Sequence, residues 1–343
     1  MRYSFRIFLI SLALTYTAVS QTPFTSDVDS LILHGIDCTF TCEFDSAMDL
    51  FQSVVDQYPE HIVGYFYQAA TLQSKMMDYE TDLWEEPFYQ KIDQAISVGQ
   101  RQIEEARDDP WTYFYLGNTY SYKGLYQAKT GGLIPGFINA RKGLYYLEKS
   151  VELDSSLYDA YLVIGNFKYW EGRFYRYLKW LPWVSDERRE GLRMIRQSIK
   201  QGTFSRWVGL NSLAWIEFDR KRFVIALKLF REGLRRYPGS RFFLWGMAHA
   251  SFRMKNYIEA ILYYQEILDS ILSNDLNNGY NEAECHLKIG LCRFYLEEFD
   301  QAIENFDAVL NRSMDEKIAE RLKKDYHEAE VYREKSQKAI RDK

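Results

Sequence analysis

The stretches "YFYLGNTY" (residues 113–120) and "YLVIGNFK" (residues 161–168) are two copies of one pattern, 48 residues apart. Each has a tyrosine, an aliphatic residue three positions later and then a glycine, which places all three on one side of a helix. A glycine among large apolar residues lets a second helix approach closely. The pattern therefore predicts helices that pack tightly in pairs.

Small residues of this kind recur along the chain in two alternating series. The first series marks one helix of each pair and consists of Gly35, Ala69, Gly117, Gly165, Ala214, Ala248 and Gly290. The second series marks the other helix and consists of Ala47, Ala95, Gly143, Gly191, Ala226, Ala260 and Ala302. Helical periodicity is almost continuous between them, and no convincing alternating strand pattern occurs. The sequence predicts an all-α repeat protein.

The two series resemble the tetratricopeptide repeat, a helix–turn–helix unit of about 34 residues with the pattern W-x2-L-G-x2-Y, A-x3-F and P. The first helix matches at Tyr113, Leu116, Gly117 and Tyr120. The second helix matches at Ala47-x3-Phe51 with Pro59, and at Ala226-x3-Phe230 with Pro238. The resemblance implies a right-handed α-solenoid of about seven helix pairs over residues 31–313, in which neighbouring units bury each other's apolar faces.

Three units are longer than the family pattern. The second series is spaced by 48, 48, 48, 35, 34 and 42 residues, which predicts insertions between paired helices near 73–88, 127–138 and 171–186. In the third insertion we expect Trp180, Pro182 and Trp183 to cover the adjacent insertions by packing, in preference to binding a ligand. The charged segment 314–343 has apolar residues at helical spacing and is predicted to be a capping helix for the last unit.

The first twenty residues have the pattern of a secretory signal. Arg2 and Arg6 precede a mostly apolar run, and Ala18-Val19-Ser20 is a cleavage site of small residues. We expect cleavage after Ser20, a short linker over 21–30, and export to the bacterial periplasm or the cell surface. Retention of this segment as a membrane anchor is the alternative.

Charge is distributed unevenly along the chain. Residues 27–110 include 18 acidic and 4 basic side chains, whereas residues 185–241 include 14 basic and 6 acidic ones. The simpler explanation of this uneven charge is that both sections form solvated outer faces of helices. The more specific explanation is a basic surface that binds anionic lipid or an acidic partner. Cys38 and Cys42 share one face of a helix, and so do Cys285 and Cys292. Buried free thiols are therefore the favoured interpretation, and disulfide bonds are the alternative.

No catalytic constellation is visible in the sequence. The five histidines are scattered, and HExxH, paired CxxC, GxSxG and phosphate-loop motifs do not occur. His286 beside Cys285 lacks further metal ligands. Export and the net charge of −5 disfavour nucleic acid as a partner. The sequence predicts a protein that is not an enzyme and needs no cofactor or metal.

A binding surface is suggested by "LGN" and "IGN", which place Asn118 and Asn166 at equivalent points of two first helices. In the tetratricopeptide family this point lines the concave groove and often hydrogen-bonds an extended peptide. The resemblance implies a groove role for these two asparagines and for Trp215 and His249, with aromatic walls from Tyr122 and Trp170. The alternative is that the asparagines bridge or cap neighbouring helices.

A further resemblance covers most of the mature chain. "LKWLPWVSDERREGLRMI" (178–195), "FFLWGMA" (242–248) and "EFDSAMDLF" (43–51) look like segments of exported bacterial tetratricopeptide proteins with long inserts. The first of them also looks locally like eukaryotic proteins linked to inclusion clearance at the mitochondrial outer membrane and to lipid handling. We therefore expect a non-catalytic scaffold of the bacterial cell envelope that binds a peptide or protein partner in its groove. A membrane-peripheral or lipid-handling protein that uses section 185–241 and the aromatic insert is the alternative, and the oligomeric state stays open.

Overall fold

The computed structural model describes residues 22–106, 108–178, 186–273 and 276–342, with side chains 174–178 not described. These residues form helices joined by turns, and no strand occurs among them. The helices are α1 (Ser26–Phe40), α2 (Phe44–Gln57), α3 (Ile62–Asp78), α4 (Glu85–Glu105), α5 (Pro110–Lys129), α6 (Leu133–Leu153), α7 (Ala160–Leu178), α8 (Arg188–Gln201), α9 (Arg206–Asp219), α10 (Phe223–Arg236), α11 (Arg241–Arg253), α12 (Tyr257–Leu272), α13 (Tyr280–Tyr295), α14 (Phe299–Leu310), α15 (Glu316–Arg321) and α16 (Lys323–Arg341).

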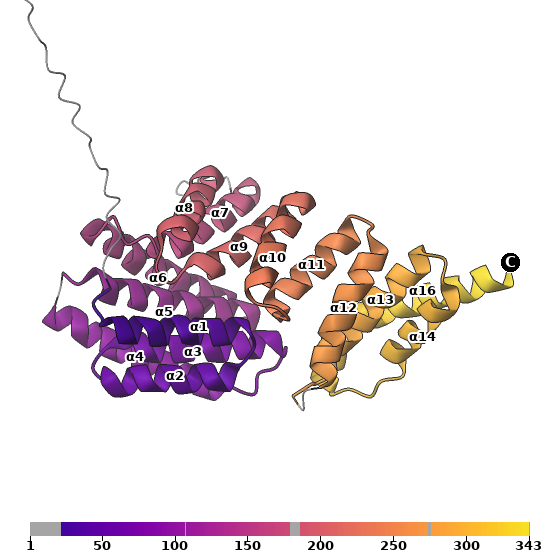
Figure 1. Cartoon of the computed structure of the whole chain (residues 1–343), viewed down its shortest axis with the longest axis horizontal. Coiled ribbons are helices and arrows are strands. Elements are labelled where there is room, and N and C mark those ends of the chain that lie inside the picture. The colour runs from indigo at the N-terminus through magenta and orange to yellow at the C-terminus, as the bar shows by residue number, and fades with distance from the viewer. Residues whose placement is uncertain (1–21, 107, 179–185, 274–275, 343) are drawn as a thin grey trace, which may run out of the picture.

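The first fourteen helices form seven antiparallel pairs that stack into a solenoid (Figure 1). The small residues of the two series lie at the contacts within pairs, as the sequence predicts. A Cβ atom added to Gly165 of α7 would lie 2.7 Å from the Gly191 carbonyl oxygen of α8, and one added to Gly35 would overlap the Phe51 ring. Phe51 is itself fully buried beside Ala47. The expected all-α solenoid of paired helices is confirmed.

The extra residues of the long units mostly lengthen the paired helices instead of forming separate segments. Helices α9 and α10 have 14 residues each, whereas α5 has 20 and α6 has 21. Of the segment expected as an insertion at 127–138, only residues 130–132 lie outside a helix, and in 73–88 only residues 79–84 do. In the third segment, residues 171–178 continue α7, and Trp180, Pro182 and Trp183 lie outside the described residues.

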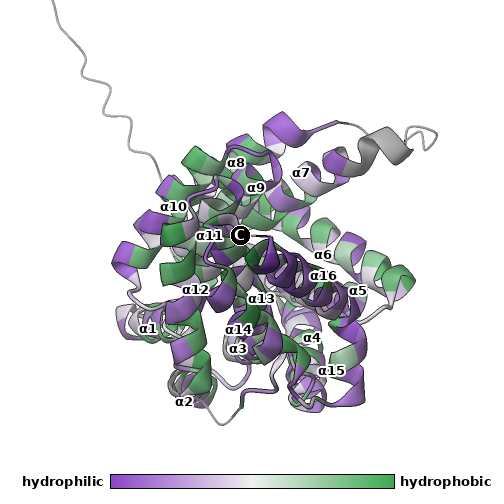
Figure 2. Ribbon diagram, turned by 90° about the vertical axis from the view of Figure 1, so that its right-hand side faces the viewer, coloured by the Kyte–Doolittle hydropathy of each residue, from purple (hydrophilic) through white to green (hydrophobic). Residues whose placement is uncertain are grey.

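The solenoid winds through a full turn, so that α10 and α11 return to the first units (Figure 2). Arg236 at the end of α10 donates to Asp37 of α1 at 2.6 Å, and the Tyr237 hydroxyl donates to the same carboxylate. Arg241 of α11 forms two hydrogen bonds from Nε to the Asp78 carboxylate of α3, at 2.9 and 3.0 Å, and both side chains are buried. We call these two ion pairs the closure.

The closure explains part of the uneven charge. Its carboxylates belong to the acidic section 27–110 and its arginines to the basic section 185–241. Burial raises the pKa of Asp78, and the hydrogen bonds from Arg241 oppose that rise. The two sections of opposite sign are thus joined inside the molecule, in addition to covering outer faces.

The C-terminal segment closes the last unit as two helices rather than one. Helix α15 ends at Arg321, and α16 begins at Lys323. Ile318, Leu322 and Ala329 are buried against α13 and α14, which confirms a cap with an apolar inner side. All four cysteines are free thiols. No helix in the described part of the chain is both long and apolar enough to cross a bilayer.

Candidate functional site

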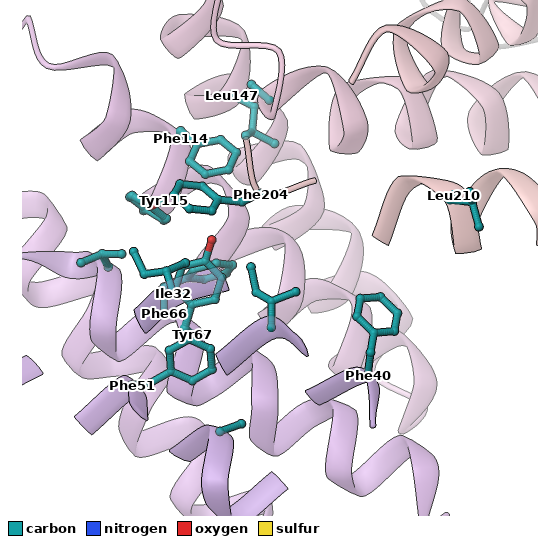
Figure 3. Close-up of a cluster of buried hydrophobic side chains, with 14 of the residues drawn as sticks. Ile32, Phe40, Phe51, Phe66, Tyr67, Phe114, Tyr115, Leu147, Phe204 and Leu210 are labelled. Carbon is teal, nitrogen blue, oxygen red and sulfur yellow. The ribbon is translucent and has the colours of Figure 1, made fainter. Parts of the chain in front are cut away.

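The inner surface of the solenoid is filled with aromatic rings along the first units. Phe40 of α1 stacks on Tyr237 and Phe243, with ring centroids 4.9 and 5.5 Å apart. Phe204, in the turn before α9, contacts the rings of Tyr67 and Trp111 across the superhelix. Figure 3 shows Tyr67, Phe114, Tyr115 and Phe204 converging from α3, α5 and this turn. The closure therefore turns the N-terminal part of the inner surface into a core.

Two residues that the sequence predicts in the groove lie in or beside this core. Asn118 is 5% exposed, and its Nδ2 donates to the Phe114 carbonyl oxygen one turn earlier in α5, at 2.8 Å. Tyr122 is half-buried and packs edge-on against Phe66 of α3, with ring centroids 5.5 Å apart. Both residues contribute to the packing of α5. Because Asn118 is buried, its amide is not accessible to the backbone of a bound peptide.

Asn166, at the equivalent point of α7, is half-buried and joins two neighbouring first helices. Its Nδ2 donates to the Leu162 carbonyl oxygen at 2.9 Å, and its Oδ1 accepts from the Ser212 hydroxyl of α9 at 2.5 Å. The amide is thus engaged on both sides, which matches the alternative of an asparagine that bridges neighbouring helices.

An open hollow lies between α7, α9 and α11, at the C-terminal ends of α9 and α11. It has a volume of about 540 Å³, and its lining residues are Trp170, Arg173, Trp215, Phe218, Asp219, Lys221 and Arg253. It therefore brings together Trp170 and Trp215, two of the predicted site residues. Trp170 lies in α7 and Trp215 in α9, which are the first helices of two neighbouring pairs. The solenoid stacks these helices side by side, so the two side chains lie close together.

The hollow combines aromatic walls with an excess of positive charge. Trp170 is 37% exposed, and Trp215 packs against Phe230 of the next helix with centroids 5.1 Å apart. The one carboxylate in the lining, Asp219, accepts hydrogen bonds from Arg173 Nε at 3.0 Å and from the Tyr169 hydroxyl at 3.1 Å. Burial, followed by this bond, raises the pKa of Tyr169 to about 12.

Two of the three cations in the lining are well exposed. Lys221 is exposed in the turn that follows α9 and has a left-handed backbone with φ of 60°. Arg253 is exposed at the end of α11, and its guanidinium lies over the Phe223 ring at 5.2 Å. These two side chains leave the hollow with a local excess of positive charge beside exposed aromatic surface.

His249, the sixth predicted residue, lies beyond Trp215 along the inner surface, at a centroid distance of 6.1 Å. Its Nδ1 shares a 2.7 Å hydrogen bond with the Tyr264 hydroxyl, and its Nε2 lies 3.7 Å from the Glu284 carboxylate. Burial lowers the pKa of His249 to about 4 and raises that of Glu284 to about 7. His249 is consequently neutral at pH 7 and does not form a strong ion pair with Glu284.

Burial also raises the pKa of the Tyr264 hydroxyl well above its ordinary value, so this hydroxyl keeps its proton at neutral pH. Across the described residues, no three His, Cys, Asp or Glu side chains gather as ligands of a metal would.

Five lining residues are not among the predicted site residues: Arg173, Phe218, Asp219, Lys221 and Arg253. Three of them belong to the segment "FDRKR" (218–222), which includes the end of α9 and the turn to α10. Turns between paired helices lie at one edge of a solenoid, so this turn could have been recognised as a neighbour of Trp170 from the repeat register alone.

Neither the family models nor the curated proteins include a match to the sequence. Among solved structures, a chain of the APC/C hetero-tetramer Cut9–Hcn1 aligns with a TM-score of 0.51 and 12% identity, over 90% of this chain and 51% of that one. The C-terminal part of a TPR repeat-containing protein from Cytophaga hutchinsonii aligns with a TM-score of 0.45 and 14% identity, over 86% and 97%. Yeast Tom70 aligns with a TM-score of 0.40 and 13% identity, over 95% of this chain and 67% of the Tom70 chain. This chain spans about half the length of the Cut9–Hcn1 chain, and the likeness concerns the fold.

Proposed function

We propose that this chain, which has the tetratricopeptide repeat fold, is a non-catalytic scaffold that binds a segment of a partner protein in the hollow between α7, α9 and α11. The observation that carries the proposal is the lining of the hollow, where Trp170, Trp215 and Phe218 lie beside Lys221 and Arg253. Exposed tryptophan and arginine side chains are the residues that most often dominate binding energy at protein interfaces.

The lining also favours one kind of partner segment. Asp219 is held by Arg173 and Tyr169, whereas Lys221 and Arg253 add positive charge at the rim. An acidic segment with one apolar or aromatic side chain would place that side chain between the two tryptophans and its carboxylates on the rim cations. The proposed partner is therefore an acidic, partly apolar peptide segment.

We infer that this binding takes place in the bacterial cell envelope. The support is the secretory pattern of residues 1–20, with cleavage expected after Ser20. An exported scaffold meets partners in the periplasm or at the cell surface, where a binding site without a catalytic or metal-binding role can assemble other proteins.

The alternative of a membrane-peripheral protein that uses the basic section 185–241 has less support. Eight of its basic side chains form ion pairs with carboxylates: Arg188, Arg193, Arg196, Arg220, Arg222, Arg231, Arg236 and Arg241. Three of these arginines share the buried Glu217 carboxylate. Part of the positive charge of this section is therefore balanced by carboxylates of the protein itself.

The test is binding of acidic peptides that contain one tryptophan-sized side chain, measured by fluorescence anisotropy at low and high salt. Lys221→Glu/Arg253→Glu reverses the charge of the rim, and we expect affinity to fall by about tenfold or more. Lys228→Glu/Arg235→Glu makes the same charge change at exposed positions of α10 and is the matched control. Equal affinities for the two double variants would overturn the assignment of the hollow.

A further inference from the structure

Helix α6 begins with a group of apolar side chains that the fold leaves exposed. Leu133, Ile134, Phe137 and Ile138 are 69%, 76%, 59% and 60% exposed, and we call these four residues the tip patch. They occupy the first two turns of α6 and run along it as one stripe, because positions i, i+1, i+4 and i+5 lie on one side of a helix. Single exposed apolar residues are ordinary on protein surfaces, but four adjacent ones indicate an interaction surface.

The tip patch is presented by a rigid helical pair. Helices α5 and α6 approach each other through Gly117, Gly124, Gly136 and Gly143, which face one another in two pairs. A Cβ atom at Gly124 would lie 2.6 Å from the Gly136 carbonyl oxygen, and one at Gly117 would lie 2.9 Å from the Gly143 carbonyl oxygen. In Figure 2 the outer end of this pair reaches the right-hand edge of the molecule, where the ribbon has the colour of hydrophobic residues. The tip patch therefore projects from the solenoid on a firm support.

Cations border the tip patch on both sides along the chain. Residues 130–140 contain no charged side chain, and they lie between Lys129 and Arg141. Lys129 Nζ lies 3.2 Å from the Glu80 carboxylate, and Arg141 lies 3.9 Å from that of Glu171. Both basic side chains are still more than a third exposed, and surface pairs of this kind exchange readily for other anions.

The size of the tip patch argues against a second copy of the chain as its partner. The tip patch has four residues, whereas a stable protein interface has roughly 20–30 residues and buries about 800 Å² on each side. The stripe is about 9 Å long, which matches the depth of roughly 5–10 Å to which interfacial elements enter a bilayer. The projecting apolar side chains are suited to the hydrocarbon region of a bilayer, and the cations beside them are suited to its anionic headgroups.

We infer that the tip patch inserts into the surface of an anionic lipid bilayer and holds the scaffold there, with Lys129 and Arg141 at the headgroups. This contact is separate from the hollow, which is lined by residues of α7, α9, α11 and the turn after α9. The protein would thus rest on a membrane through α6 while its binding hollow faces a partner.

Co-sedimentation with vesicles tests the inference, with the protein in the form that its host produces. The vesicles contain phosphatidylglycerol and phosphatidylcholine in about equal parts, with pure phosphatidylcholine for comparison. Ile134→Asp/Phe137→Asp changes the tip patch, and Ile258→Asp/Leu262→Asp makes the same change at residues of α12 that are 68% and 65% exposed. We expect the wild-type protein and the α12 variant to bind anionic vesicles with similar affinity. The affinity of the tip variant should be lower by about tenfold or more.

Three results would overturn the inference: no binding of the wild-type protein to anionic vesicles at low salt, equal binding of the two double variants, or a wild-type dimer that the tip variant converts to a monomer without any vesicle binding. Circular dichroism establishes that each variant is folded. If the tip variant does not fold, Leu133→Ser/Ile138→Ser takes its place, since serine at these exposed positions introduces no charge. Peptide binding at the hollow is measured on the same variants and is expected to be unchanged, so the two proposals fail separately.

Discussion

Glu284 of α13 and His249 of α11 lie 3.7 Å apart on the inner surface, and burial shifts their pKa values in opposite directions. Each shift favours the uncharged side chain. The pKa of His249 is lowered to about 4, and the pKa of Glu284 is raised to about 7. The folded state therefore keeps a proton on Glu284 at pH values at which the unfolded chain has lost it. This pair makes stability depend on pH without any ion pair being broken.

The consequence is testable with Glu284→Gln. Because the pKa of Glu284 rises from 4.5 to about 7 on folding, this residue lowers the free energy of unfolding progressively as pH increases between those values. Glutamine does not titrate, so at about pH 8 the variant should be more stable than the wild type by about 1–2 kcal/mol, after allowance for partial exposure of the site. Urea unfolding at about pH 4.5 and pH 8 measures this.

His249 titrates in both proteins and so does not affect the comparison. Near pH 4.5 the carboxyl group of the wild type is mostly protonated and resembles glutamine, and the difference should be small. Glu320→Gln changes an exposed carboxylate of α15 and is the control. A stability difference between wild type and Glu284→Gln that does not grow with pH would contradict the assignment.

Among individual residues, the sequence predicts packing positions better than binding positions. A small residue beside an aromatic one has the same role wherever the repeat occurs, so Ala47, Phe51 and Phe230 are buried as expected. Asn118 and Asn166 share a repeat position but not an environment, because Asn118 is buried in α5 whereas Asn166 in α7 is half-buried and accepts a hydrogen bond from Ser212 of α9. The repeat register fixes where a side chain points, and the rest of the molecule decides what it meets.

At the scale of helices, the close approach of paired glycines predicts which substitutions the solenoid tolerates. Gly165→Ala would place a methyl group 2.7 Å from the Gly191 carbonyl oxygen, which is backbone and cannot move alone. We expect α7 and α8 to separate slightly and the free energy of unfolding to fall by about 1–3 kcal/mol, despite the better helix propensity of alanine.

Gly99→Ala in α4 is the matched control, because its added methyl group would meet the terminal methyl groups of the Ile62 and Leu116 side chains and no backbone atom. That variant should be close to neutral or slightly stabilised. Thermal or urea unfolding of both variants tests the comparison, and a loss of similar size in each would show that backbone contact at Gly165 is not the cause.

The lengths of the helices were not predictable from the landmark spacing. About fourteen extra residues per unit can form an inserted segment or lengthen both helices by about seven residues, which is two turns. Both arrangements keep the small residues in register, and the structure has the second one for α5 and α6. Gly131 and Gly132 lie in the turn between α5 and α6, whereas Pro135 lies in the first turn of α6, where proline is well tolerated.

For the whole molecule, the closure gives contacts between residues more than 160 positions apart in the sequence. A simple solenoid is stabilised by neighbouring units alone, so that each unit depends only on the next. Here α1 and α3 also depend on α10 and α11. Nothing in the local pattern indicates which units meet, since that follows from the accumulated rotation between successive pairs.

Arg241→Met tests the closure. Removing the guanidinium leaves the buried Asp78 carboxylate without its partner, which should lower the free energy of unfolding by about 3–5 kcal/mol. We also expect the radius of gyration measured by small-angle X-ray scattering to increase, because the first units lose their buried ion pair with α11 and keep only the remaining contacts, such as that of Phe40 with Phe243.

Asp78→Asn/Arg241→Met removes both charges and should recover much of the lost stability. Arg235→Met, at an exposed position of α10, is the control for loss of one positive charge. Unchanged scattering and stability in Arg241→Met would mean that the aromatic contacts of Phe40 hold the first units without the buried ion pair.

The closure also fixes the number of repeats. An open solenoid can gain or lose a helix pair during evolution, because each new unit only extends the stack. In this chain, one additional pair between α3 and α11 would rotate Arg241 past Asp78, and one fewer would stop it short. Duplication and deletion of whole units are therefore constrained between these residues, whereas length can vary freely in the helices themselves, as the long α5–α6 pair illustrates.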